Sequence, residues 1–180
     1  GDVVLVSPSN QWRYFIGTHE PSGGIVEGVN VPPGIRGLEW TLASFDTGDW
    51  PAGPGGIGFG DGDDATDVSN QMYNAYVTLY MRQAFVVSEF DAALTNALEF
   101  VANFDDGYIA YLNGVEISRT NMGAAGSYVT YDMAATASRE AGVSVTSVLS
   151  AAQTLLVPGT NMLAIQVANQ VVNSGDLSMV

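Results

Sequence analysis

The stretch NFDDGYIAYLNGVEISRTNM, residues 103–122, decides the fold. At its centre, Asn113-Gly114 supplies the two positive-φ residues of a type I′ turn, the strongest short-range signal for a β-hairpin. A two-residue turn at this point predicts one strand over residues 108–112 and a returning strand over residues 115–119. Residues 103–122 therefore predict an antiparallel pair of strands.

Side chains alternate along a strand, so the turn also predicts which hairpin residues share a face. One face is mostly apolar and should pack on a core. Its expected opposed pairs are Leu112 with Val115, Ala110 with Ile117 and Tyr108 with Arg119. The other face carries Tyr111, Glu116 and Ser118, is amphipathic, and is predicted to meet solvent or a ligand. The preceding Asp105-Asp106-Gly107 is typical of a turn.

The rest of the chain is also rich in predicted strands. We expect them over residues 3–6, 12–16, 77–87, 94–104, 127–133, 162–168 and 177–180. Helical periodicity is confined to residues 134–156, where one or two short helices are expected. Short strands with turn signals every ~8–12 residues predict an all-β fold, an antiparallel β-sandwich of the jelly-roll type. Without a linker or repeat, residues 1–180 should form a single domain.

The charge balance excludes several classes of partner. Nineteen Asp and Glu residues oppose five Arg residues, and the net charge is −14. Nucleic acids and anionic membrane surfaces both require basic patches. No apolar stretch is long enough to span a bilayer, so membrane insertion is not expected. An acidic surface leaves carboxylates available for cations, although a salty habitat would explain the same composition.

The absence of cysteine excludes disulfides, zinc-thiolate sites and thiol nucleophiles. Cysteine-free chains are common among secreted bacterial proteins. Because the first residue is Gly1, we expect a processed mature chain or an excised fragment. The expected location is therefore secreted, extracellular or on the cell surface.

Residues 51–67 form a glycine-rich acidic loop that predicts a structural Ca²⁺ site, because calcium takes several hard oxygen ligands. The expected ligands are Asp61, Asp63, Asp64 and Asp67. Asp105 or Asp176 could contribute from elsewhere in the fold. The loop is not an EF-hand, because Ala65 and Met72 stand where ligands are required. The alternative is a solvated loop whose Asp side chains cap local turns.

The order of several motifs resembles a known fold family. The landmarks are Trp12-Arg13-Tyr14, Phe45-Asp46 with Trp50, GIGFGDG at 56–62, Arg82 with Phe85, DDG at 105–107, YLNGVE at 111–116 with Arg119 and Asn121, Gly159-Thr160-Asn161, and SGDL at 174–177. Together they resemble the galactose-binding-domain-like jelly rolls of secreted bacterial multidomain proteins. The Asn-Gly hairpin with its acidic lead-in is also similar to the sugar-binding domain of family 2 glycosidases. Ala168 stands where such sequences often carry a His.

The resemblance implies a non-catalytic, extracellular carbohydrate-binding module. Its partner would be a polysaccharide or glycan, held by aromatic stacking and hydrogen bonds. The expected ligand-binding residues are Tyr111, Glu116, Arg119 and Asn121. The alternative for any one aromatic residue is a place in the core.

The second expected function is a structural or adhesive subunit of a surface assembly or filament. In that case the apolar residues 3–6 would add to the sheet edge of a neighbouring copy of the chain. An enzyme is not expected; at most, the chain is an accessory domain of one. His19 is the single histidine and lies in a Pro/Gly-rich loop, and no Ser occupies a nucleophile elbow.

Overall fold

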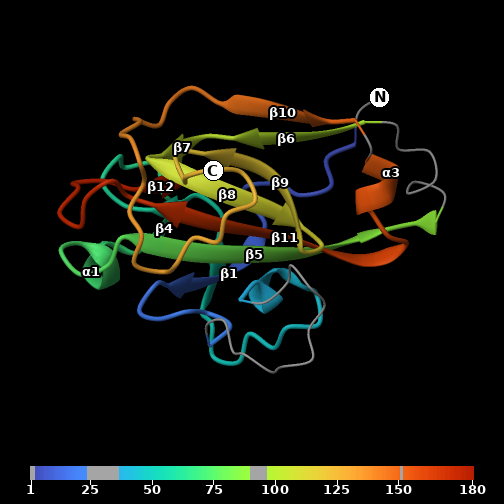
Figure 1. Ribbon diagram of the computed structural model, residues 1–180, viewed down its shortest axis with the longest axis horizontal. Coiled ribbons are helices and arrows are strands. Elements are labelled where there is room, and N and C mark those ends of the chain that lie inside the picture. The colour runs from blue at the N-terminus through green and yellow to red at the C-terminus, as the bar shows by residue number, and fades with distance from the viewer. Residues whose placement is uncertain (1–2, 24–36, 90–96, 151) are drawn as a thin grey trace.

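The computed structural model describes residues 3–23, 37–89, 97–150 and 152–180. Its largest element is a six-stranded antiparallel sheet with the order β2-β1-β5-β11-β8-β9 (Figure 1). Its strands are β1 (Gln11–Ile16), β2 (Ala52–Pro54), β5 (Thr78–Val87), β8 (Gly107–Leu112), β9 (Val115–Thr120) and β11 (Gly159–Ala168). The long strands β5 and β11 pair along their whole length and form the centre of the molecule.

Shorter strands form the opposing layer. These are β6 (Leu98–Ala102) with β10 (Val145–Leu149), β7 (Phe104–Asp105) with β12 (Ser178–Met179), and the parallel pair β3 (Ile57–Gly58) and β4 (Thr66–Asp67). The described helical segments are η1 (Glu39–Thr41), α1 (Ser69–Met72) and α3 (Ala152–Leu155). None of these helices is long and apolar enough to cross a membrane. The predicted β-sandwich with short helices is confirmed.

Both faces of the large sheet are buried, which explains why every residue of β8 is buried. Successive side chains alternate between two cores. Tyr108 and Ala110 pack with β6 and β7. Ile109 and Tyr111 pack on the opposite side with the passage around η1, residues 38–50. Figure 1 shows β6 and β10 at the top of the view, above β8 and β11 of the large sheet.

The passage around η1 is fastened to the sheet by a buried arginine. The Arg82 guanidinium donates to the backbone oxygen of Leu42 at 2.6 Å and to that of Phe45 at 3.3 Å. It also lies 5.2 Å from the centre of the Phe45 ring. These contacts cover a sheet face that would otherwise meet solvent.

The Asn113-Gly114 turn forms as predicted, with φ of 51° and 85°. Leu112 pairs with Val115, which is the predicted register. A bulge then shifts the pairing, so that Ala110 opposes Ser118 and Tyr108 opposes Thr120. The expected pairs of Ala110 with Ile117 and of Tyr108 with Arg119 are therefore wrong, because Ile117 is the extra residue of the bulge.

The structure confirms some of the remaining predicted strands and contradicts others. Those over residues 12–16, 77–87, 162–168 and 177–180 are confirmed in essence, and β6 lies within 94–104, of which 94–96 lie outside the described residues. Residues 3–6 and 127–133 form no strand. Residues 145–149, which have helical spacing, form β10 because β6 offers a pairing edge, while the predicted short helix is α3.

Candidate functional site

Tyr111 does not present its ring to solvent. Its side chain is 3% exposed, and its ring meets the edge of Trp40 with centroids 5.8 Å apart. Burial raises the pKa of Tyr111 to about 12. The expectation that this face of the hairpin meets solvent or a ligand at Tyr111 is wrong, because the passage around η1 covers it.

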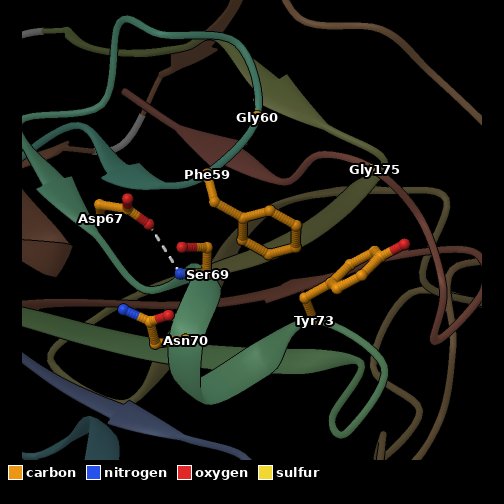
Figure 2. A pocket seen from close by; sticks show the side chains of 7 residues that line it. All are labelled: Phe59, Gly60, Asp67, Ser69, Asn70, Tyr73 and Gly175. Atoms are coloured by element: carbon orange, nitrogen blue, oxygen red, sulfur yellow. Dashed lines mark hydrogen bonds between the residues drawn. The ribbon is translucent and has the colours of Figure 1, made fainter.

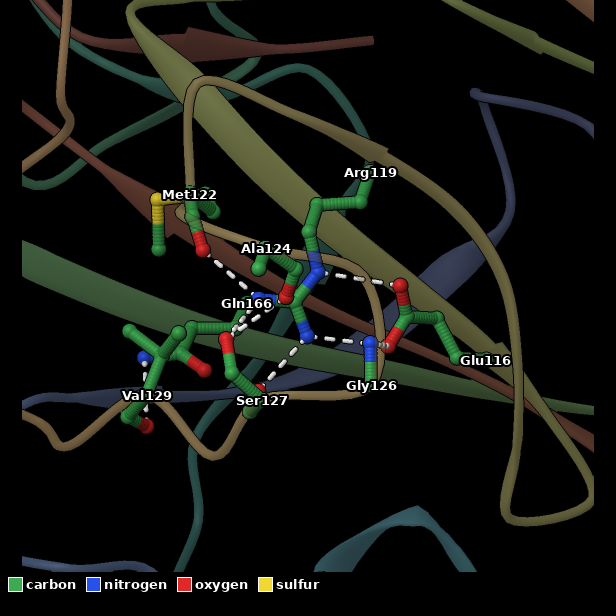
Figure 3. A network of polar contacts seen from close by, with 8 residues as sticks. All are labelled: Glu116, Arg119, Met122, Ala124, Gly126, Ser127, Val129 and Gln166. Atoms are coloured by element: carbon green, nitrogen blue, oxygen red, sulfur yellow. Dashed lines mark hydrogen bonds and ion pairs between the residues drawn. The ribbon is translucent and has the colours of Figure 1, made fainter.

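Glu116 and Arg119 bind each other rather than facing an open groove. The Arg119 Nε and Nη2 atoms each donate to one carboxylate oxygen of Glu116 at 2.9 Å. Arg119 also donates to the backbone oxygens of Met122 and Ser127, and the Gly126 N–H donates to Glu116 (Figure 3). The pair therefore organises the loop after β9.

Asn121 also has a structural role. Its φ is 55°, and its Nδ2 donates to the backbone oxygen of Asp106 at 2.9 Å. The structure thus brings Glu116, Arg119 and Asn121 into one region of β9 and its loop, but engages their polar groups internally.

A surface pocket of about 450 Å³ lies at another place, beside α1. Its lining residues are Phe59, Gly60, Asp67, Ser69, Asn70, Tyr73 and Gly175 (Figure 2). In the part of the chain that the structure describes, Tyr73 and Tyr76 are the most exposed aromatic side chains, at 51% and 37%. Of these two, Tyr73 lines the pocket. Its ring lies 6.4 Å from that of Phe59, at an interplanar angle of 74°.

Buried neighbours hold the pocket residues in place. Val68 and Met72 are fully buried and anchor the single turn of α1, from which Asn70 and Tyr73 project. Asp67 accepts a hydrogen bond from the Ser69 N–H at 2.7 Å. Hydrogen bonds from Ser69 lower the pKa of Asp67, so this carboxylate is ionised at the pocket rim.

The four predicted calcium ligands do not converge. Asp61, Asp63 and Asp67 are exposed, and Asp67 faces the pocket as the cap of Ser69. Asp64 is half-buried, and burial followed by Asp63 and Asp61 raises its pKa to about 6. Among the described residues, the group of three carboxylates close enough for one metal ion is a different one.

That group consists of Asp105, Glu140 and Asp176, with one carboxylate oxygen of each within 4.8 Å of the others. Asp105 is 1% exposed, and its Oδ1 has no hydrogen-bond partner. Burial, followed by Asp106, Asp176 and Glu140, raises the pKa of Asp105 to about 7. Asp106 has a separate structural role, because its two oxygens accept the N–H groups of Arg139 and Gln170 at 2.7 Å.

Sequence patterns did not single out the pocket or Glu140. Tyr73 is one of many aromatic residues, and its exposure depends on how α1 sits on the sandwich. Phe59 and Tyr73 lie on either side of the acidic residues 61–67 in the sequence. Sequence spacing alone does not show that their rings meet.

No protein-family model matches the sequence, and no curated protein matches it. Solved structures of the β-glucuronidase from Ruminococcus gnavus share the fold. The apo form is 15% identical with a TM-score of 0.50, covering 92% of this chain and 21% of the enzyme. The complex with uronic deoxynojirimycin is 15% identical with a TM-score of 0.50, covering 92% and 22%. The chain therefore spans about a fifth of these enzymes, and identity at this level shows a shared fold alone.

Proposed function

We propose that the chain is a non-catalytic carbohydrate-binding module that acts outside the cell and takes a glycan at the Tyr73 pocket. The observation that carries the proposal is the half-exposed Tyr73 ring beside a pocket rimmed by Asp67, Ser69 and Asn70. This assignment replaces Tyr111 as the stacking residue.

The chemistry of the pocket suits a sugar. An aromatic face packs on the apolar C–H face of a sugar ring, and neighbouring polar groups take its hydroxyls. Tyr73 supplies the ring, while the Asn70 amide both donates and accepts. The ionised Asp67 accepts hydrogen bonds. The pocket volume of about 450 Å³ falls within the range of small-molecule sites.

A binding role suits the pocket better than hydrolysis. Glycosidases normally place two carboxyl groups on either side of the scissile bond. Among the described residues that line the pocket, Asp67 is the single carboxylate. The shared fold with part of a glycosidase chain is compatible with an accessory sugar-binding domain. Strand addition between copies has less support, because residues 3–6 form no strand.

The proposal is tested by screening the protein on a glycan array and measuring hits by calorimetry. Replacement Tyr73→Ala should weaken binding about fivefold or more, since stacked aromatic contacts contribute on the order of 1 kcal/mol. Tyr76→Ala is the matched control, because Tyr76 is exposed, lies three residues away and does not line the pocket. Absence of any glycan hit, or equal effects of the two variants, would overturn the assignment.

A further inference from the structure

Three segments that are distant in sequence bring carboxylates to one point. Asp105 ends β7, Asp176 precedes β12, and Glu140 lies in the connection before β10. β7 and β12 pair directly, with Asp105 opposite Ser178, which explains the approach of Asp105 and Asp176. One oxygen from each of the three carboxylates lies within 4.8 Å of the other two.

An unpaired buried oxygen provides a second, independent observation. Asp105 is 1% exposed, and its Oδ1 lacks a hydrogen-bond partner in the described structure. Burying a charged carboxylate without a partner is strongly unfavourable. The neighbouring Asp176 and Glu140 carboxylates make this worse rather than better, because they add like charge at the same point.

The nearby basic side chain is engaged elsewhere. The Arg139 guanidinium donates to the backbone oxygens of Phe104 and Val143 and lies over the Phe104 ring. Among the described residues, the one ion pair with a nitrogen–oxygen distance within 4 Å joins Arg119 to Glu116 on β9, away from the Asp105 group. Among the same residues, no ion pair forms at the Asp105 group, which leaves its negative charge for a small cation.

We propose that Asp105, Asp176 and Glu140 bind a Ca²⁺ ion. Calcium takes several oxygen ligands at about 2.3–2.6 Å, so oxygens bound to one ion can lie up to about 5 Å apart, whereas Mg²⁺ usually keeps several waters and is held by one or two carboxylates. The three oxygens lie within 4.8 Å of one another, a span that one Ca²⁺ ion can bridge. Asp105 is buried, Asp176 is half-buried and Glu140 is exposed. The ion therefore has a route to the site from solvent.

A cation here would tie the end of the chain to the rest of the sandwich. It would join β7 to the segment before β12, and Leu177 in that segment exchanges backbone hydrogen bonds with Phe59 at 2.8 and 2.9 Å. The inference concerns stability and does not depend on sugar binding.

The test is thermal unfolding of the full chain at pH 7.5 in chelator, in 1 mM Ca²⁺ and in 1 mM Mg²⁺. Calcium should raise Tm by about 4 °C or more, and Mg²⁺ should raise it less. Asp105→Asn should abolish the calcium response while leaving Tm in chelator equal or higher, because the variant removes a buried unpaired charge. Asp49→Asn removes an exposed charge and should keep the full response.

A second variant protects the test against failure of Asp105→Asn to fold. Glu140 is exposed, so Glu140→Gln should fold normally and reduce the calcium response by at least half. The proposal is overturned if the wild type does not respond to calcium, if Mg²⁺ acts as strongly, or if both ligand variants respond like Asp49→Asn. Calorimetric titration with calcium should give one site in the wild type.

Discussion

Arg119 and Glu116 point to the same side of β9 although they are three residues apart. In a regular strand, residues i and i+3 face opposite sides. The bulge at Ile117 removes this difference, so Tyr111 opposes Glu116 and Ile109 opposes Arg119 on one face. The two side chains then form a bidentate ion pair with both distances at 2.9 Å.

Replacement Arg119→Lys should therefore destabilise the protein. Lys cannot reproduce the planar fork that bridges Glu116 and two backbone oxygens. We expect the free energy of unfolding to fall by about 1–3 kcal/mol, measured by urea denaturation. Arg13→Lys is the control, because Arg13 is exposed and makes one bond to the Trp50 oxygen. Equal losses of stability in the two variants would show that the Glu116–Arg119 ion pair does not contribute to stability beyond an exposed arginine.

The hairpin shows how far sequence reasoning extends. Asn113-Gly114 predicted the turn and the first pair because positive φ is a local property of those residues. The bulge was not predictable, since it depends on which register best buries side chains on both faces. The burial of Tyr111 was hidden for a related reason, because residues around Trp40, far away in sequence, cover it.

Alkaline pH should expose the contribution of Tyr111. Burial raises its pKa from 10 to about 12, so the folded state favours the neutral phenol. Its contribution is fully present below pH 10 and is lost as the pH rises through 12. Tyr111→Phe cannot ionise and should lose less stability than the wild type between pH 9 and pH 12, followed by denaturant titration. Parallel losses in both proteins would contradict this prediction.

The proposed cation site could not be assembled from spacing. Asp105, Glu140 and Asp176 are separated by more than thirty residues at each step. The acidic loop at residues 61–67 drew attention because its carboxylates are adjacent in sequence, yet adjacency in a turn directs side chains apart. The strand at residues 145–149 illustrates the same limit, since pairing with β6 overrides a helical pattern.

The close contact of Gly58 with Leu177 should make Gly58 intolerant of a side chain. A Cβ at Gly58 would lie 2.0 Å from the backbone oxygen of Leu177, where the segment before β12 pairs with Phe59. Backbone cannot move aside as a flexible side chain can, so the substitution must separate the two segments.

Gly58→Ala should lower the free energy of unfolding by about 2–3 kcal/mol, at the upper end of overpacking costs. Gly175→Ala is the matched control, because a Cβ there meets nothing within 4 Å. It should change stability by less than about 0.5 kcal/mol. Urea denaturation of both variants in chelator separates this steric effect from any effect of calcium. Equal stability of the two variants would show that the Phe59–Leu177 pairing contributes little to the fold.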